Sequence, residues 1–240
     1  MKYLFVLVAA LVLAACGGSP APTADAPTAA PVVPTAVPAT ATAKPTDAPT
    51  STPKPTNTPA PPTPTPAPVE LKGEGKTVTD PVVPPGGINR VRFTHAGQRN
   101  FIVTAYRESG DSDILANKIG AYIGQSLLLG RESVYFEVNA DGPWSITLEQ
   151  IYQTDEATNG LVGNGDTVSD GFAPAKTGPV PYAITHDGKR NFIARLMCAG
   201  GEDYVANEIG PVDGAVVAKF SKGPCIWVVQ ADGNWSLKPK

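Results

Sequence analysis

The hydrophobic pattern changes twice along the chain and divides it into three parts. An apolar run from Leu4 to Ala15 follows the basic start Met1-Lys2. From Ser19 to about Val69 the chain is almost wholly Pro, Ala, Thr, Val and Ser, and no aromatic residue lies between Phe5 and Phe93. Beyond Leu71, apolar and polar residues alternate in short segments, which predicts strands with one buried face.

The alternating segments come in pairs that flank turn-forming residues. In the first pair, Val91 and Phe93 precede Gly97, and the alternation resumes at Phe101, Val103 and Ala105. In the second, Phe136 and Val138 precede Asp141-Gly142, and Trp144, Ile146 and Leu148 follow. Gly and Asp-Gly at these positions predict hairpins. No 3.6-residue apolar stripe occurs after residue 70, so we expect an all-β fold.

The part of the chain beyond Leu71 is an internal duplication with an offset of 90 to 91 residues. Thr94-His95-Ala96-Gly97-Gln98-Arg99-Asn100-Phe101-Ile102 recurs as Thr185-His186-Asp187-Gly188-Lys189-Arg190-Asn191-Phe192-Ile193. Ala116-Asn117-Lys118-Ile119-Gly120 recurs as Ala206-Asn207-Glu208-Ile209-Gly210, and Ala140-Asp141-Gly142-Pro143-Trp144-Ser145 as Ala231-Asp232-Gly233-Asn234-Trp235-Ser236. Several short strands in about 80 residues are typical of an antiparallel sandwich or small barrel. The sequence therefore predicts two tandem antiparallel β-sandwich repeats, over residues 71–153 and 160–240; a single intertwined sandwich is the alternative.

The N-terminal segment resembles a bacterial lipoprotein signal. Residues 1–15 have a basic start and an apolar run shorter than the roughly 20 residues that span a membrane. The run closes on Leu13-Ala14-Ala15-Cys16, which resembles the lipobox, in which the cysteine is acylated and becomes the mature N-terminus. This resemblance implies lipidation at Cys16 and stable anchoring in a membrane. More than one acyl chain anchors a protein stably, whereas a single chain gives only marginal membrane binding. An ordinary signal peptide with an incidental Cys16 is the alternative.

Residues 16–70 are predicted to be a disordered Pro/Thr-rich linker. Proline lacks an N–H and favours polyproline II. At roughly 3.1 Å per residue, such a spacer reaches on the order of 100 Å from the membrane. Its many threonines are candidate sites for O-linked sugars.

Charge and cysteine content narrow the possible partners. The net charge of −3 without a block of like charges argues against nucleic-acid binding. With Cys16 lipidated, Cys198 and Cys225 are left in an exported, oxidising setting. They align with Arg107 and Val134 of the first repeat and lie on inward strand faces, so we predict a disulfide between them, with two free buried thiols as the alternative.

The repeated motifs His-x-Gly-x-x-Asn-Phe and Ala-Asp-Gly-x-Trp-Ser resemble a small β-sandwich module of exported and lipid-anchored bacterial proteins. The resemblance covers nearly all of both repeats. It supports the fold and an extracytoplasmic location more than a particular function, since no settled activity is associated with the module.

The candidate site residues lie beside the repeated glycines. His95, Arg99, Asn100, His186, Arg190 and Asn191 are either turn residues or a shared ligand-binding edge. A catalytic role for the histidines would need a partnered nucleophile or base. Neither motif supplies one, and the usual catalytic and phosphate-binding motifs are absent. We therefore expect no enzymatic activity and no cofactor.

Three further residue sets have competing interpretations. The acidic pairs Asp111/Asp113 and Glu202/Asp203 lie in matching loops, which are either simply solvated or form a weak Ca²⁺ site. We expect no bound metal. Trp144, Trp227 and Trp235 are expected in the core, with sugar stacking as the alternative. Tyr106, Tyr122 and Tyr182 are candidate exposed sugar platforms.

The leading functional hypothesis is a non-enzymatic, surface-anchored lipoprotein that presents two β-sandwich modules for binding at the cell envelope. Two copies that engage one target would add avidity. Loops 107–113 and 198–203 are the expected recognition edges, and an envelope protein or cell-wall polysaccharide is the expected partner. A carbohydrate-binding module and a purely structural envelope protein are the alternatives.

Overall fold

The computed structural model describes residues 65–154 and 160–240. The predicted signal peptide 1–15, the lipidation site Cys16 and nearly all of the predicted linker 16–70 lie outside the described residues. Within the described ranges, no helix is long and apolar enough to cross a membrane. The two repeats belong to the same compact unit.

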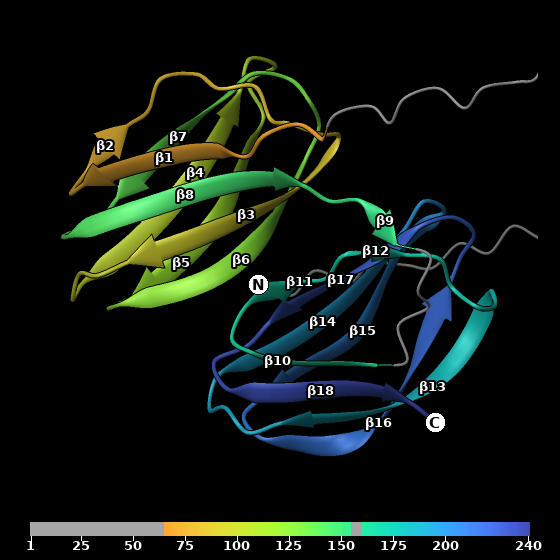
Figure 1. Cartoon of the computed structure of the whole chain (residues 1–240). Coiled ribbons are helices and arrows are strands. Elements are labelled where there is room, and N and C mark those ends of the chain that lie inside the picture. Colours follow the sequence, from red (N-terminus) through yellow and green to blue (C-terminus); the bar gives the residue numbers. More distant parts are fainter. Residues whose placement is uncertain (1–64, 155–159) are drawn as a thin grey trace, which may run out of the picture. The chain divides into compact units, whose positions relative to one another are not determined.

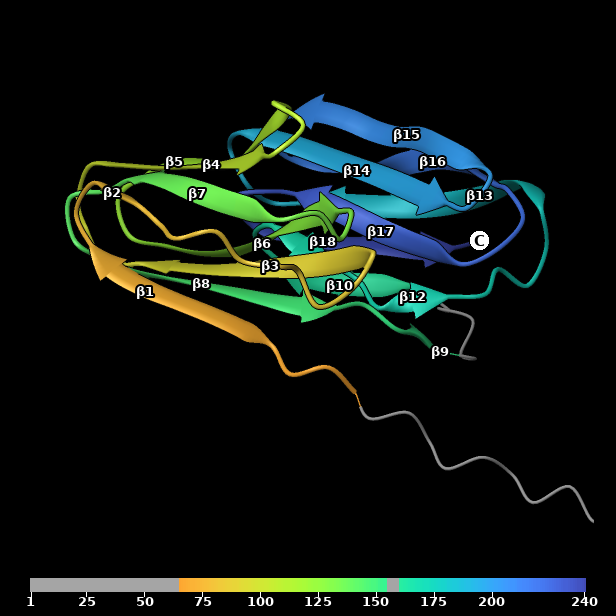
Figure 2. The same cartoon turned by 90° about the horizontal axis from the view of Figure 1, so that it is seen from above.

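The first repeat is a sandwich of two antiparallel four-stranded sheets (Figure 1). One sheet has the order β1-β8-β3-β6, with β1 Val69–Glu74, β8 Pro143–Gln150, β3 Ile88–His95 and β6 Tyr122–Leu129. The other has the order β2-β7-β4-β5, with β2 Thr77–Val78, β7 Val134–Asn139, β4 Asn100–Arg107 and β5 Ser112–Ile119. Figure 2 shows the two layers of this repeat edge-on. The strands alternate buried and exposed residues, as the period-2 pattern predicts.

The second repeat has the same topology with one extension. One sheet has the order β10-β18-β13-β16, with β10 Leu161–Asn164, β18 Asn234–Pro239, β13 Gly178–His186 and β16 Val212–Phe220. The other contains β15 Gly201–Ile209, β14 Asn191–Cys198, β17 Cys225–Gln230 and β12 Gly171–Phe172, and β11 Thr167–Val168 also pairs with β17. Here β9, Gln153–Thr154, joins β12 in parallel, so the chain leaving the first repeat becomes part of the sheet of the second. The predicted fold of two tandem β-sandwiches is confirmed.

The predicted hairpins at Gly97 and at Asp141-Gly142 are wrong. Strands β3 and β4 flank Gly97 but lie in different sheets, and so do β7 and β8, which flank Asp141-Gly142. Both connections are therefore crossovers from one layer of the sandwich to the other. Alternation does not reveal this, because a strand with one buried face has the same pattern whether its neighbour in sequence is beside it or opposite it.

Each sandwich buries its own core between its two sheets. In the first repeat Phe93, Phe101, Phe136 and Ile146 are at most 1 % exposed. Trp144, Trp227 and Trp235 are 4 %, 1 % and 3 % exposed, so their predicted place in the core is confirmed.

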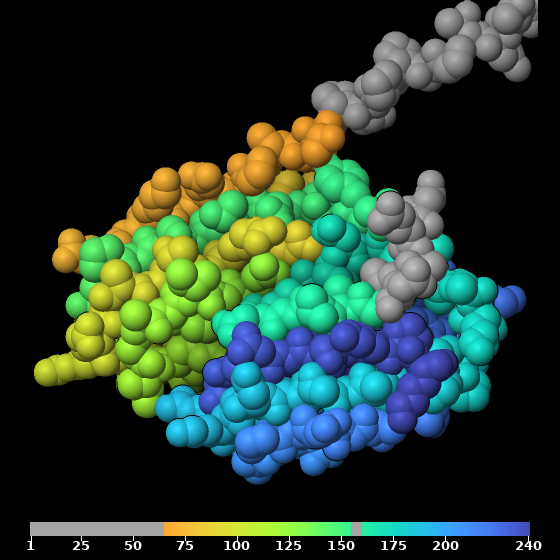
Figure 3. All heavy atoms as spheres, turned by 60° about the horizontal axis from the view of Figure 1, so that its bottom comes forward, coloured from red at the N-terminus to blue at the C-terminus, as the bar shows by residue number. Residues whose placement is uncertain are grey.

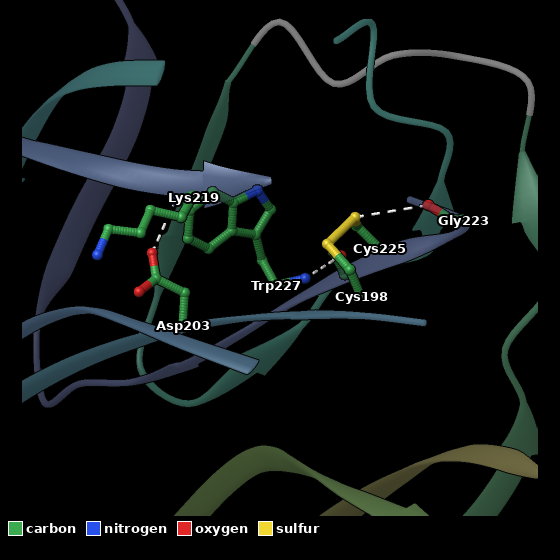
Figure 4. Close-up of a disulfide and its surroundings, with 7 residues drawn as sticks. Cys198, Asp203, Lys219, Gly223, Cys225 and Trp227 are labelled. Carbon is green, nitrogen blue, oxygen red and sulfur yellow. Dashed lines mark hydrogen bonds between the residues drawn. A yellow bond between two sulfur atoms is a disulfide. The ribbon is translucent and has the colours of Figure 1, made fainter. Parts of the chain in front are cut away.

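A disulfide joins Cys198 on β14 to Cys225 on β17 (Figure 4). The two residues are directly opposite each other in the antiparallel ladder. The Arg107–Val134 pair occupies the same register in the first repeat. Both sandwiches thus share this ladder, and the disulfide is an additional covalent link in the second repeat only.

The outer face of β17 differs between the repeats. Strand β7 alternates as expected, and Tyr135 is 39 % exposed. In β17 the equivalent outward residues, Ile226 and Val228, are only 5 % and 3 % exposed. Val168 on β11 is 2 % exposed, whereas its counterpart Val78 is 60 % exposed. Ile226, Val228 and Val168 are buried against Ile151, with Leu127 of the first repeat packed beside them.

Hydrogen bonds and ion pairs join the two repeats in addition to this apolar contact. Asp166, just before β11, accepts a hydrogen bond from Tyr122 Oη at 2.7 Å and forms an ion pair with Lys118, both from the first repeat. Burial and the Asp166 carboxylate together raise the pKa of Tyr122 above its ordinary value. Buried Arg90 donates to the carbonyl oxygen of Val168 and forms ion pairs with Asp170 and Glu149. The repeats are therefore joined by a specific interface of apolar and hydrogen-bonded charged groups.

We predict that Ile226→Glu uncouples the repeats. A carboxylate at this buried position would lack a partner, at a cost of several kcal/mol, so the interface should open while each sandwich retains its own core. Calorimetry should show the thermal transition of the full chain splitting into two. The matched control is Tyr135→Glu at the equivalent exposed position, which should leave the transition unchanged. A single unshifted transition for Ile226→Glu would contradict this account of the interface.

Candidate functional site

One end of the first sandwich is held together by His95, Asp141 and Gly120. The Asp141 carboxylate, on the β7–β8 crossover, accepts hydrogen bonds from the backbone N–H groups of Gln98 and Arg99 on the β3–β4 crossover, at 3.0 and 3.1 Å. His95 Nδ1 lies 2.9 Å from the carbonyl oxygen of Gly120 in the β5–β6 turn, so Nδ1 carries the hydrogen. Three connections of the chain thus meet around one histidine and one aspartate.

Glycines make this close approach possible. A Cβ on Gly97 would overlap both Asp141 Oδ1 and His95 Nε2, and a Cβ on Gly142 would lie 3.0 Å from the backbone of Gly97. Gly120 has φ 87°, a left-handed conformation that favours glycine. Its N–H donates to the carbonyl oxygen of Arg99 at 2.7 Å. The motif glycines are therefore explained by steric and backbone requirements.

The second repeat reproduces the arrangement atom for atom. Asp232 accepts from the N–H groups of Lys189 and Arg190 at 3.1 and 3.0 Å, and His186 Nδ1 lies 2.9 Å from the carbonyl oxygen of Gly210. The histidines stack on Phe101 and Phe192, with ring centroids 4.7 and 4.9 Å apart.

Two differences between the repeats form a matched pair, because one supplies a hydrogen-bond donor and the other supplies its acceptor. Asp187 replaces Ala96 and accepts a hydrogen bond from the N–H of Asn234, while the first repeat has Pro143, which lacks an N–H, at the position of Asn234.

The core tryptophans Trp144 and Trp235 pack against two Gly-x-Gly segments, Gly73-Glu74-Gly75 and Gly163-Asn164-Gly165. Trp144 Nε1 donates to the carbonyl oxygen of Gly75, and Trp235 Nε1 to that of Gly165, at 3.1 and 2.9 Å. A Cβ on Gly73 or Gly163 would overlap the indole ring. These glycines serve packing and satisfy the indole N–H groups, as buried tryptophans require.

The structure separates the predicted ligand edge into buried and exposed residues. The side chains of His95 and His186 are 0 % exposed, so the prediction that they form part of a binding edge is wrong. Their Nε2 atoms lie 3.3 and 3.4 Å from the aspartate Oδ1 atoms, without the geometry of a hydrogen bond. Neither ring nitrogen is accessible to a substrate. Arg99, Asn100, Arg190 and Asn191 are exposed.

These four exposed residues line a pocket that is built twice. In the first repeat it has a volume of about 520 Å³ and is lined by Gln98, Arg99, Asn100, Ile119, Asn139, Ala140 and Asp141. In the second repeat the equivalent residues are Lys189, Arg190, Asn191, Ile209, Gln230, Ala231 and Asp232, and all seven line a cleft of about 880 Å³. We call these the first pocket and the second pocket.

The polar side chains of the pockets are free to contact a ligand. Within residues 65–154 and 160–240, the side chains of Arg99, Arg190, Asn100 and Asn191 take part in no hydrogen bond or ion pair. The aspartates, by contrast, are committed to the crossovers. The backbone N–H groups of Gln98 and Arg99 hold the pKa of Asp141 below its ordinary value. Burial opposes ionisation of Asp232, but the N–H groups of Arg190 and Lys189 outweigh it, so its pKa is also lowered.

The second pocket is larger because the first repeat supplies one of its walls. Residues of β5 and β6, among them Asn117, Lys118 and Ile123, line it together with Asn164 and Asp166 of the second repeat. Figure 3 shows the yellow-green atoms of the β5–β6 region lying against the teal atoms that precede β11.

Other candidates from the sequence lie elsewhere. Loops 107–113 and 198–203 lead into β5 and β15 at the opposite ends of β4 and β14 from Asn100 and Asn191. Their acidic residues are used locally: Asp113 pairs with Arg107, Glu202 with Arg195, and Asp203 accepts from the N–H of Lys219. Among the described residues, no three His, Cys, Asp or Glu side chains gather as metal ligands.

The three tyrosines predicted as exposed sugar platforms differ in exposure, and Tyr122 lines the second pocket. Tyr182 is 3 % exposed, so the prediction that it is a surface residue is wrong. Tyr122 is committed to Asp166, and Tyr106 stacks on Tyr135 with ring centroids 5.3 Å apart, which covers one face of each ring.

Sequence reasoning missed the isoleucines of the pockets. Ile119 and Ile209 are 69 % and 80 % exposed, and they precede Gly120 and Gly210 in both copies. The repetition of a large apolar residue at a position that alternation places outside was the available signal.

A scan of the chain against protein-family models finds no match, and neither does a search of curated proteins.

We predict that acid destabilises both sandwiches through Asp141 and Asp232. Because their pKa values are lower in the folded chain than in the unfolded chain, their stabilising contribution is present at neutral pH. It should be lost as pH falls from about 4, the ordinary value for aspartate, through the lower folded values. Chemical unfolding between pH 7 and pH 2 should show a flatter pH dependence for Asp141→Asn/Asp232→Asn than for the wild type. The exposed-carboxylate control Asp213→Asn should keep the wild-type slope, and a double variant with that slope would contradict the prediction.

Proposed function

We propose that this chain is a non-enzymatic, surface-anchored lipoprotein whose two β-sandwich repeats bind a partner at the cell envelope through the first and second pockets. The observation that supports this most directly is the duplicated pocket. Arg, Asn and Ile recur at equivalent exposed positions, and within residues 65–154 and 160–240 the Arg and Asn side chains have no hydrogen-bond or ion-pair partner.

The contrast with the other motif residues strengthens the proposal. The histidines, aspartates, glycines and tryptophans of the motifs all have structural partners, so their recurrence is explained by folding. Among the described residues, the exposed arginine and asparagine side chains have no such partners, and the isoleucines are largely exposed. Free polar groups beside an exposed apolar side chain are typical of a recognition surface.

The anchor and the spacer fit the same function. The lipobox resemblance at Cys16 supports an extracytoplasmic chain held by acyl groups, and the Pro/Thr-rich spacer would extend the repeats away from the membrane. Two pockets on one chain would increase the overall affinity for a repetitive target.

A carbohydrate ligand is the second candidate. Amide side chains line both pockets, with Asn100 and Asn139 in the first and Asn191 and Gln230 in the second. An amide group both donates and accepts hydrogen bonds, as hydroxyl groups do.

The test is co-sedimentation of the full chain with insoluble cell-wall polysaccharide and, separately, with delipidated envelope protein from the source cells. We expect saturable binding to one fraction, weakened at least tenfold by Arg99→Gln/Arg190→Gln. The matched control Arg131→Gln/Lys222→Gln removes two exposed charges outside both pockets and should bind as the wild type does.

In the same cells, labelled palmitate should enter the wild-type chain and should not enter Cys16→Ala. Equal loss of binding in the pocket variant and the control would refute the pockets as the binding site. Label in Cys16→Ala would refute the anchor, and turnover of a panel of ester, peptide and glycoside substrates would refute a non-enzymatic role.

A further inference from the structure

The first and second pockets differ in charge. Six of the seven lining positions hold the same residue or, for Asn139 and Gln230, the same amide group, but Gln98 of the first pocket is replaced by Lys189 in the second. Within the described ranges, neither Lys189 nor Arg190 has an ion-pair partner. The second pocket therefore has two adjacent free cations where the first has one.

The acidic groups of the second pocket do not neutralise these cations. Asp166 has a side chain only 4 % exposed, and it is already bound by Lys118, by Tyr122 Oη and by the backbone N–H of Ala231. The carboxylate of Asp232 accepts the N–H groups of Lys189 and Arg190 and lies beside His186. Asp232 has a side chain that is 31 % exposed, but it forms no ion pair with Lys189 or Arg190, so the lining has three cations against two carboxylates.

The rest of the lining fits a polyhydroxylated ligand. Asn117 on the first-repeat wall and Asn191 and Gln230 on the second-repeat wall are exposed amides. Ile114, Ile123 and Ile209, which are 67 %, 82 % and 80 % exposed, supply apolar edges against which the C–H face of a sugar ring can pack. The volume of about 880 Å³ exceeds that of the first pocket because of the first-repeat wall.

We propose that the second pocket binds a glycan that carries carboxylate groups, with Lys189 and Arg190 facing the carboxylates and the amides of both walls facing the hydroxyls. This rests on the proposed binding function and deepens it, because it assigns the ligand class and makes the site dependent on both repeats. The first pocket lacks both the second cation and the opposite wall, so it should bind the same glycan weakly.

The experiment measures binding of polygalacturonate to the full chain by titration calorimetry at 50 and 300 mM NaCl. Dextran serves as the uncharged glycan and poly-L-glutamate as the acidic peptide. The wild type should bind polygalacturonate more tightly than either, and more weakly at high salt.

Three variants locate the site. Lys189→Gln should lower the affinity at least fivefold and reduce the salt dependence, while Lys222→Gln, the same change at an exposed position outside the pockets, should have less than a twofold effect. Asn117→Asp places a negative charge on the first-repeat wall, which would repel the carboxylates of the glycan, and should weaken binding at least threefold. Gln98→Lys gives the first pocket the missing cation without the wall and should raise the affinity less than twofold.

Several outcomes would overturn the proposal. Equal binding of poly-L-glutamate would show that any polyanion suffices, and equal binding of dextran would show that the carboxylates are not recognised. An unchanged affinity for Lys189→Gln would place the glycan elsewhere. If envelope fractions still bind through Arg99 and Arg190 while polygalacturonate does not bind, the assignment of the ligand fails and the binding function stands. If neither the envelope fractions nor polygalacturonate bind, both the ligand assignment and the proposed binding function fail.

Discussion

Each sandwich depends on one carboxylate that joins two crossovers between its sheets. A sandwich whose chain passes repeatedly from one layer to the other must hold its crossing segments together at the ends, where no ladder of hydrogen bonds runs between the layers. Asp141 and Asp232 do this by accepting the N–H groups of the neighbouring crossover. The buried histidine beside each carboxylate extends the link to the third connection, through the carbonyl oxygen of Gly120 or Gly210.

This constraint separates folding from recognition within one short motif. In His-x-Gly-x-Arg-Asn-Phe, the histidine, glycine and phenylalanine point into the sandwich or make room for it. The arginine and asparagine lie on the same segment but are exposed. The aspartate accepts the backbone N–H of the arginine, so the backbone at the rim of the pocket is held in place. A rigid backbone under free side chains lowers the ordering cost of binding.

The two copies have diverged mainly on their outer faces. The second repeat has Ile226 and Val228 where the first has Tyr135 and Glu137, and only the apolar pair is covered. The contact is head-to-tail, because the face buried in the second repeat is open in the first. It also brings the β5–β6 edge of the first repeat to the second pocket, so duplication has given two pockets of unequal size and charge.

Much of the fold followed from the sequence, because alternation, internal repetition and turn residues are local signals. The core position of Trp144 followed from its alternation with Ile146 and Leu148. The crossovers at Gly97 and Asp141 did not, since alternation does not say which layer the next strand joins. The interface between the repeats was missed although β17 reads Cys-Ile-Trp-Val-Val, a run that is apolar on both faces. The hydrogen bond from Tyr122 to Asp166 joins residues 44 positions apart in the chain, and sequence spacing alone does not indicate it.

The most direct test of the central role of the aspartate that joins the crossovers is the stability of Gly188→Ala measured against Gly214→Ala. A Cβ at Gly188 would overlap Asp232 Oδ1 and His186 Nε2, both held in place, whereas a Cβ at Gly214 meets nothing within 4 Å. Chemical denaturation should show a loss of about 1–3 kcal/mol in the free energy of unfolding for Gly188→Ala, as overpacking costs. Gly214→Ala should stay within about 0.5 kcal/mol of the wild type. Equal stability of the two variants would contradict the account, because the glycine would then not be needed for the corner to close.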